Sequence, residues 1–276
     1  VSARRNELSV TRIEKLIRDP YAIYAEYTLR LRRLDPLAPE PDARVKGTVL
    51  HRVLDKYVQA HPPGTPGSVE AFLAIAETVL AEECPWQAVR LHWLARLRQT
   101  AKAFVAWNAE IDAELVVAEK KASLTLANPP FVLTGKPDRI DRTADGLVQI
   151  YDYKTGTLPS TKQQDLFNKQ LVLLAIMAED GAFADLGPVR VGGAEYVGLG
   201  TAFKQAKADV SSENLAKHRV ELAALLTAYQ DPSQGFTAMR AVATEDRIDD
   251  YHPLARRGEW QPSDPSETIL VGDHDG

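Results

Sequence analysis

Cysteine is almost absent from this chain, and long apolar runs are missing as well. The 276 residues include a single cysteine, Cys84, which excludes a disulfide within the chain, a four-cysteine zinc site and a four-cysteine iron–sulfur cluster. No run approaches the roughly 20 apolar residues of a membrane-spanning helix, and the start VSARRNELSV lacks the apolar centre of a signal peptide. We therefore expect a cytoplasmic protein in which Cys84 is a packing residue.

Excess positive charge and several common catalytic motifs are also lacking. The formal net charge is −5, which argues against a protein that coats nucleic acid through bulk charge. Basic residues gather at 30–33, 90–102 and 120–121, where they could follow a phosphate backbone or form solvated helix faces. No G-x-x-x-x-G-K-[ST], G-x-S-x-G or H-E-x-x-H pattern occurs, which excludes a P-loop motor and gives no support for a serine hydrolase or a zinc peptidase.

Residues 131–156, FVLTGKPDRIDRTADGLVQIYDYKTG, are the most informative stretch, and we interpret them as two strands joined by a tight turn. Residues of high strand propensity alternate through the stretch, and the Asp-Gly pair near its middle is a hairpin signal. If the loop comprises residues 144–146, with Gly146 in the left-handed conformation, Thr143 pairs with Leu147. This register decides which side chains share a face, because side chains alternate between the two faces of a strand.

In this register Asp138 faces Asp152, and Lys136 faces Lys154 on the same side of the hairpin. A two-residue loop at 145–146 would instead place the two aspartates on opposite faces. Carboxylates that face each other repel, so the pair predicts a cation between them, and carboxylates are common ligands of Mg²⁺. Two exposed acids on a solvated hairpin are the alternative interpretation. The metal site is favoured by the apolar residues on the same predicted face, namely Ile140, Val148 and Ile150.

The stretch carries two motifs that resemble those of the PD-(D/E)XK nuclease superfamily, in its RecB-like branch. The first motif, GxxDRID, is formed by residues 135–141, and the second, DYKTG, by residues 152–156. The resemblance implies an α/β fold of the restriction-endonuclease type, in which a central mixed sheet is flanked by helices and preceded by a mainly helical N-terminal part. It also implies metal-dependent hydrolysis of DNA phosphodiester bonds.

The same resemblance adds a histidine outside the hairpin to the candidate site residues. His51 ends the segment GTVLH at residues 47–51, which is similar to a G-T-x-x-H motif whose histidine contributes to the metal site of RecB-like nucleases. Without the resemblance, a single histidine on a helix is more simply a surface residue. The implied metal ligands are His51, Asp138, Asp152 and the main-chain carbonyl of Tyr153.

The resemblance also assigns catalytic roles, with Asp138, Asp152, Lys154 and Gln170 as the implied catalytic group. Lys154 is expected to orient the attacking water or stabilise the transition state, and Gln170 to help place that water. RecB-like chains often have Q-x-x-x-Y here, whereas this chain has Leu174 in place of the tyrosine. Glu119 could point toward the site, but an acid on the surface of an edge strand is the simpler interpretation.

Periodicity and capping residues predict the remaining elements. Helices are expected at 10–19 after a Ser9 N-cap, and at 21–29, 45–61, 69–80 after Ser68, 86–111, 161–180 and 213–230 after Ser211. Strands are expected at 114–126, leading into the hairpin, and at 195–197, which makes a βαβ-like unit. Residues 34–41 and 61–67 are expected to be loops.

We expect residues 1–260 to form a single RecB-like nuclease domain. It would contain a mainly helical part at 1–112, an α/β catalytic core at 113–230 and a C-terminal extension at 231–260. Residues 261–276 would form a flexible polar tail. The extension contains a pattern similar to the end of the nuclease domain of bacterial AddB proteins, formed by Tyr251, Leu254, Ala255, Arg256, Glu259 and Trp260.

The resemblance implies the nuclease domain of an AddB-like subunit, belonging to a helicase–nuclease that repairs double-strand breaks. The expected cofactor is Mg²⁺, with Mn²⁺ as a substitute and no iron–sulfur cluster. Expected partners are a single-stranded DNA end, cut exonucleolytically, and an AddA-like helicase–nuclease subunit, with no membrane partner. The first residue is Val rather than Met, so we expect the native chain to continue upstream. Two alternatives are a non-catalytic DNA-binding or scaffolding module and a stand-alone RecB-like exonuclease.

Overall fold

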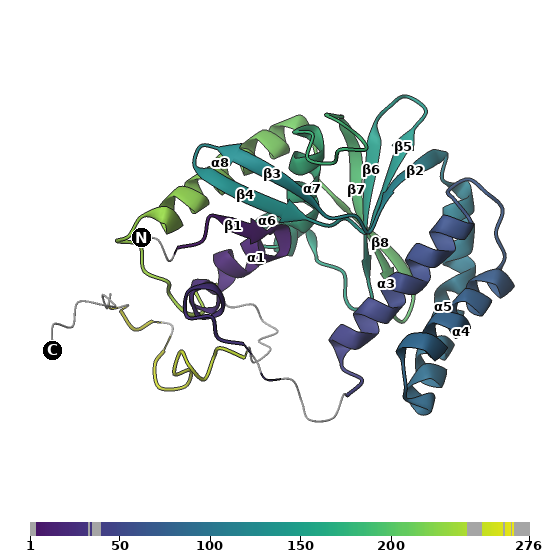
Figure 1. The fold of residues 1–276 in the computed structure, drawn as a ribbon, viewed down its shortest axis with the longest axis horizontal. Coiled ribbons are helices and arrows are strands. Elements are labelled where there is room, and N and C mark those ends of the chain that lie inside the picture. The colour runs from purple at the N-terminus through teal and green to yellow at the C-terminus, as the bar shows by residue number, and fades with distance from the viewer. Residues whose placement is uncertain are drawn as a thin grey trace. The chain divides into compact units, whose positions relative to one another are not determined.

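The computed structural model of the chain describes residues 4–32, 34, 40–241, 250–261, 263–265 and 267. Two compact units can be distinguished in it. One unit comprises residues 1–35, 125–134 and 219–276, and the other comprises residues 36–124 and 135–218. Strands and helices are both abundant, and the predicted α/β class is confirmed (Figure 1).

A five-stranded mixed sheet forms the centre of the second unit. Its strand order is β2-β5-β6-β7-β8, with β6 and β7 parallel and the other neighbours antiparallel. The strands are β2 (Ala113–Ala118), β5 (Arg139–Thr143), β6 (Val148–Lys154), β7 (Val191–Leu199) and β8 (Phe203–Ala208). The predicted hairpin corresponds to β5 and β6, inside the sheet, and the predicted βαβ-like unit corresponds to β6, the intervening helices and β7.

The predicted register of the hairpin is confirmed. Ile140 pairs with Ile150, and the Thr143 N–H donates to the carbonyl of Leu147 at 2.9 Å. Gly146 has a φ of 83°, the left-handed conformation that the three-residue loop requires and that glycine adopts without a steric penalty. The local turn chemistry therefore sets which residues face each other across the two strands.

The first strand of the predicted hairpin is shorter than expected. Residues 131–135 belong to another strand, β4 (Pro130–Gly135), which lies in a three-stranded sheet of order β1-β4-β3 with β1 (Glu7–Ser9) and β3 (Ala122–Ala127). Pro137 interrupts the chain between β4 and β5, because proline has no N–H to donate to a sheet. The predicted pairing of Lys136 with Lys154 is therefore wrong, since the ladder of β5 and β6 begins at Arg139.

A second predicted strand is also divided. The segment at 114–126 forms β2 and β3, which belong to different sheets and are separated by a bend at residues 119–121. Glu119 has a φ of 51° at this bend, a left-handed conformation that is unfavourable for a residue with a side chain. The sequence there contains no glycine or asparagine that would have signalled the change of direction.

Three long helices pack on one face of the five-stranded sheet. They are α3 (Ala43–Ala60), α4 (Val69–Glu83) and α5 (Gln87–Glu110), which lie side by side in Figure 1. Their buried side chains form one apolar core with sheet residues such as Tyr151, Tyr153 and Val197. Because side chains alternate along β6, Asp152 and Lys154 must point to the other face.

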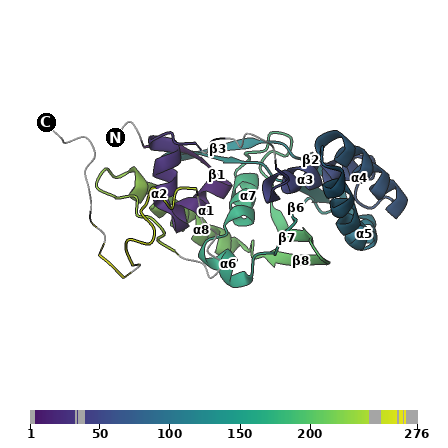
Figure 2. The same ribbon diagram turned by 90° about the horizontal axis from the view of Figure 1, so that it is seen from below.

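The other face of the sheet is met by α7 (Gln170–Glu179), which follows the short α6 (Thr161–Leu166) and contacts β6 and β7. Figure 2 shows α7 next to the strands in a second view. The predicted single helix at 161–180 is wrong, because residues 167–169 leave the helical conformation between α6 and α7. Asn168 lies in this break, and asparagine competes with helical hydrogen bonds through its side chain.

Gly135, the first residue of the GxxDRID motif, has a packing role. A Cβ atom at this position would lie 2.8 Å from both Leu174 Cδ2 and Met177 Sδ on α7. Real Cβ atoms do not approach other atoms so closely, so a larger residue would force the side chains of Leu174 and Met177 to shift. The absence of a side chain at Gly135 therefore allows the close packing of α7 on this strand.

In the first unit, the N-terminal helical segment begins with α1 (Val10–Arg18), whose predicted N-cap Ser9 accepts a hydrogen bond from the Arg12 N–H at 3.3 Å. The predicted helix at 21–29 is present as α2 (Pro20–Ile23) followed by a π-helical turn, η1 (Tyr24–Thr28). α8 (Ser212–Gln230) begins after Ser211, whose hydroxyl accepts from the Asn214 N–H at 3.4 Å.

Several predictions concern residues that the structure leaves undescribed. They include Arg33 of the basic group at 30–33, most of the loop at 34–41 and most of the tail at 261–276. The division of residues 1–260 into a helical part, a core and an extension stays a prediction. Among the described residues, no helix combines the length and apolar character needed to cross a membrane.

Candidate metal centre

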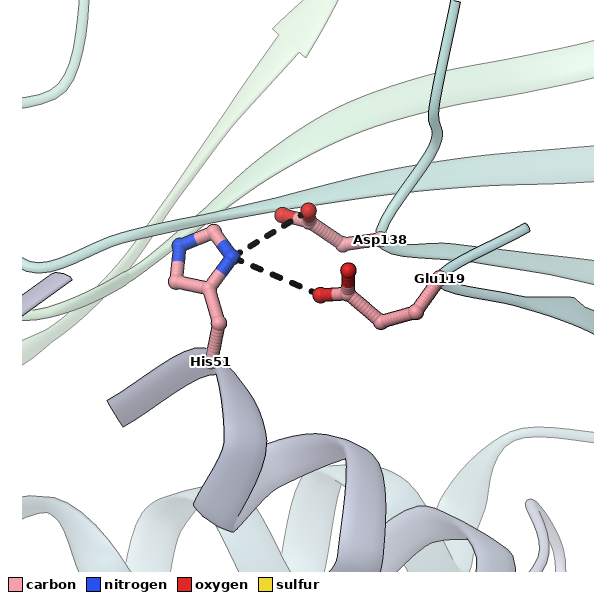
Figure 3. Close-up of side chains that lie close together, drawn as sticks. All are labelled: His51, Glu119 and Asp138. Carbon is pink, nitrogen blue, oxygen red and sulfur yellow. Dashed lines mark ion pairs between the residues drawn. The ribbon is translucent and has the colours of Figure 1, made fainter. Parts of the chain in front are cut away.

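Three potential metal ligands converge from three separate elements (Figure 3). His51 lies on α3, Glu119 follows β2, and Asp138 directly precedes β5. The His51 Nδ1 atom is 3.2 Å from Asp138 Oδ1 and 3.7 Å from Glu119 Oε1. One candidate ligand atom from each residue can be chosen such that all of them lie within 4.8 Å of one another. One imidazole and two carboxylates are a donor set that suits a divalent cation.

Asp138 is held by the hairpin that it begins. Its Oδ2 atom accepts a hydrogen bond from the Tyr153 N–H at 2.6 Å, which leaves Oδ1 directed at His51. The side chain is 9% exposed, so the carboxylate is nearly removed from bulk water. The orientation of Asp138 therefore depends on the backbone of β6, where the second motif lies.

Glu119 is directed at His51 by the left-handed backbone conformation at the bend after β2. Its N–H donates to the Asp138 carbonyl at 3.2 Å, and this contact accompanies the left-handed conformation at the bend. Its carboxylate lies between His51 and Lys136, with which it forms an ion pair. The Glu119 side chain therefore points toward His51, from a bend rather than from an edge strand. The only sequence feature that could have pointed to Glu119 as a site residue is its position directly after a valine-rich strand.

Protonated His51 is strongly favoured when no metal is bound. Burial alone would lower the pKa of His51, but hydrogen bonds to Asp138 and Glu119 and the charges of Asp138 and Asp152 raise it to about 10. In this state the imidazolium supplies a positive charge between the two acids. A metal ion that takes this position must therefore displace a proton from His51.

Asp152, Lys154 and Gln170 form a second group beside these three residues. The Lys154 Nζ atom is 2.6 Å from Asp152 Oδ2 and donates to Gln170 Oε1 at 3.0 Å. The amide of Gln170 in turn donates to Asp152 Oδ1. Each member thus contacts the other two, and the ammonium of Lys154, 29% exposed, has a defined position.

Asp152 is close enough to Asp138 for their charges to interact. Burial raises the pKa of Asp152, and the charge of Asp138 raises it further, while Lys154 opposes both effects; the result is a pKa of about 6. A carboxylate with this pKa is partly ionised near neutral pH, and an added cation would favour its ionised form. We refer to His51, Glu119, Asp138, Asp152 and Lys154 together as the front cluster.

The remaining residues of the first motif form a different arrangement, on the face of the sheet that α5 covers. Arg139 and Asp141 are 1% and 0% exposed, and Arg139 Nη2 lies 2.6 Å from Asp141 Oδ2. Arg139 Nη1 also donates to Asn108 Oδ1 on α5 at 2.8 Å and contacts the Tyr153 hydroxyl at 3.5 Å. We refer to Asn108, Arg139, Asp141 and the Tyr153 side chain as the back cluster.

The structure thus brings the predicted site residues His51, Asp138, Asp152, Lys154 and Gln170 into two adjoining groups. Tyr153 contributes its N–H to Asp138, while its ring packs edge-on to His51 with ring centroids 6.3 Å apart. The predicted roles of these residues as ligands or catalysts stay predictions. Glu119 is the one addition that sequence reasoning had set aside.

Comparison with known proteins decides the family. A model of the PD-(D/E)XK nuclease superfamily matches residues 7–257, which is most of the chain. The chain belongs to the PD-(D/E)XK nuclease superfamily. The front cluster of this PD-(D/E)XK chain lies within the matched region.

Curated relatives of this PD-(D/E)XK chain come from Rickettsia. An uncharacterized protein of Rickettsia bellii is 32% identical over 64% of this chain, and one of Rickettsia felis is 30% identical over 64%. The matched region spans 22% of the length of each relative. The crystal structure of SSO0001 is similar over 79% of this chain and 76% of the SSO0001 chain, with 16% identity and a TM-score of 0.29.

Proposed function

We propose that this chain is a deoxyribonuclease domain that hydrolyses phosphodiester bonds with a divalent metal ion. The observation that carries the proposal is the convergence of His51, Glu119 and Asp138 beside Asp152 and Lys154, in a member of a nuclease superfamily. Acids and a lysine in this arrangement suit phosphate chemistry, because the substrate and its transition state are both anionic.

His51, Glu119 and Asp138 would hold the metal ion, with Asp152 and the main-chain carbonyl of Tyr153 as further ligands. Mg²⁺ is the proposed ion, and Mn²⁺ would substitute because it accepts the same oxygen ligands and also imidazole. Such an ion, when bound, lowers the pKa of a water ligand and neutralises charge on the phosphoryl oxygens.

The protein's own groups would then position the substrate. Lys154 presents an ammonium that Asp152 and Gln170 hold in place, and this charge would orient the attacking water or stabilise the developing charge on phosphorus. Gln170 would keep Lys154 directed at the site rather than at Asp152 alone. Asp138 accepts a hydrogen bond from the Tyr153 N–H, so the hairpin would position this carboxylate before substrate arrives.

The finer assignment is a RecB-like, AddB-type nuclease domain. The combination of GxxDRID, DYKTG and the terminal pattern around Trp260 supports it. On this proposal the full protein acts in the cytoplasm on double-strand breaks, together with an AddA-like helicase–nuclease subunit, and digests a single-stranded DNA end as an exonuclease. The front cluster, with its intact acids and lysine, favours catalysis over a purely DNA-binding role.

A cleavage assay tests the proposal. The purified chain should shorten end-labelled single-stranded DNA in the presence of Mg²⁺ or Mn²⁺, and chelation with EDTA should stop the reaction. Asp152→Ala should remove cleavage but keep the fold, as monitored by circular dichroism. A well-folded wild-type chain that binds DNA in Mn²⁺ without cutting it would contradict the proposal and support the non-catalytic alternative.

A further inference from the structure

Tyr196 on β7 lies next to the group formed by Asp152, Lys154 and Gln170. It contacts Lys154 and Asn168. It pairs with Asp152 across the parallel strands β6 and β7, so its side chain shares the face of Asp152 and Lys154. The tyrosine is fully buried, with 0% of its surface exposed. We propose that Tyr196 is a positioning residue that places both Lys154 and Gln170, an inference that rests on the proposed function for its kinetic consequences.

The ring of Tyr196 faces the ammonium of Lys154. The Lys154 Nζ atom lies 5.4 Å from the ring centroid, within the range of a cation–π interaction. Asp152 and Gln170 contact the same ammonium through oxygen atoms. The aromatic face therefore limits where Lys154 can move without adding a further charge that would draw it away from a substrate phosphate.

The hydroxyl of Tyr196 acts at a different place. It donates to Oδ1 of Asn168, in the break between α6 and α7. Gln170 is the first residue of α7, so its position follows directly from the geometry of this break. In a single helix over 161–180, the backbone of the helix would fix the position of Gln170. Because α7 begins at Gln170, its position instead depends on residues 167–169, where Tyr196 bonds to Asn168.

One buried side chain thus contacts Lys154 directly and is connected to Gln170 through Asn168. The ring contributes directly to Lys154, and the hydroxyl contributes through Asn168 to Gln170. The two contributions can be separated, because phenylalanine keeps the ring and removes the hydroxyl, whereas leucine removes both. A residue that only fills space would not show this separation.

NMR of the metal-free full chain tests the structural part. Tyr196→Phe should shift the side-chain amide signals of Gln170 and keep the ring-current shift of the Lys154 ε-methylene signals, whereas Tyr196→Leu should change both. Gln170→Ala and Lys154→Ala identify the signals. Tyr57→Phe is the matched control, since Tyr57 is equally buried and its hydroxyl has no hydrogen-bond partner among the described residues; it should move neither signal.

A double-mutant cycle tests the kinetic part. Tyr196→Phe should lower kcat for DNA cleavage about fivefold, as expected for one hydrogen bond, and Tyr196→Leu about tenfold or more, with KM and Mn²⁺ affinity unchanged. In a Gln170→Ala background, the effect of Tyr196→Phe should fall below about twofold, because the hydroxyl acts through Gln170.

Unmoved Gln170 signals in Tyr196→Phe, or equal losses of kcat in the two backgrounds, would overturn the inference. If the wild-type chain cleaves no DNA, the proposed function fails, and the NMR measurement alone decides whether Tyr196 places Lys154 and Gln170.

Discussion

The front cluster and the back cluster come from adjacent residues of one motif, yet they differ in burial and in the balance of their charges. Asp138 belongs to the front cluster, and Arg139 and Asp141 belong to the back cluster. The back cluster is sealed from water and pairs its one cation with its one carboxylate. The front cluster is partly exposed and holds three carboxylates close together, with His51 and Lys154 as cations within the cluster and Lys136 paired with Glu119 beside it.

This difference separates anchoring from chemistry within one short segment. A buried ion pair with balanced charge is not stabilised further by binding a cation. Clustered carboxylates near the solvent are stabilised by a metal ion, because it offsets their mutual repulsion. The alternation of side chains along β5 and β6 is what sends neighbouring residues to the two clusters. Mutations in the back cluster should therefore affect stability first, and mutations in the front cluster should affect activity first.

Asp141→Ala should give the largest loss of stability and tests the back half of the comparison. It leaves the Arg139 guanidinium buried without its carboxylate, which costs about 3–5 kcal/mol in the free energy of unfolding. Urea denaturation monitored by circular dichroism measures this change. Asp112→Ala, at an exposed aspartate before β2, is the control and should change the free energy by less than about 0.5 kcal/mol. Equal effects of the two substitutions would break the comparison.

Lys154→Ala tests the expectation that mutations in the front cluster affect activity first. It should lower kcat for DNA cleavage by about a hundredfold to a thousandfold, because it removes a positive charge directed at the developing transition-state charge. The free energy of unfolding should fall less than in Asp141→Ala, because Lys154 is partly exposed and the buried Asp152 carboxylate, whose pKa is already raised to about 6, can take up a proton. Lys204→Ala, at an exposed lysine on β8 outside the basic groups, serves as the control in the same assay and should retain activity. A destabilised but active Lys154→Ala chain would contradict the assignment.

Glu119→Ala tests whether Glu119 is one of the metal ligands in the front cluster. Loss of one of three clustered ligands should weaken Mn²⁺ binding about tenfold or more, as measured by isothermal titration calorimetry. Glu114→Ala, an exposed acid on β2, should leave Mn²⁺ affinity unchanged. Unaltered binding in Glu119→Ala would return Glu119 to the role of a surface acid paired with Lys136.

The pH dependence of metal binding tests the part of His51 in the front cluster. Because the pKa of His51 is raised to about 10 in the metal-free chain, its imidazole is protonated at pH 7 and must lose that proton to bind a metal. Mn²⁺ affinity should therefore rise with pH, by up to about tenfold per unit between pH 7 and 9. His51→Gln should bind Mn²⁺ more weakly and lose most of this dependence, and a flat profile in the wild-type chain would exclude His51 as a ligand.

The features that sequence predicted well are the local ones. The Asp-Gly turn signal and the alternation in β5 and β6 were enough to set the register, because glycine readily adopts the left-handed conformation that a three-residue loop requires at position 146. Serine N-caps before α1, α4 and α8 were found for the same reason, since each cap acts within one turn of its helix.

The features that sequence missed depend on contacts between distant segments. The left-handed bend at Glu119 is accompanied by a hydrogen bond to Asp138, and no glycine marks it. The break before Gln170 is tied to Tyr196 on a later strand. Pro137 did signal the division between β4 and β5, and the strong strand pattern around it concealed that signal. Each miss lies next to the front cluster, where function competes with regular structure.

Anomalous diffraction from crystals of the chain soaked in Mn²⁺ tests the central claim most directly. The account predicts a Mn²⁺ peak bound by His51, Glu119 and Asp138, with Asp152 beside it. A peak elsewhere in the chain, or fully soaked crystals without a peak at these residues, would contradict the claim that the front cluster is a metal centre.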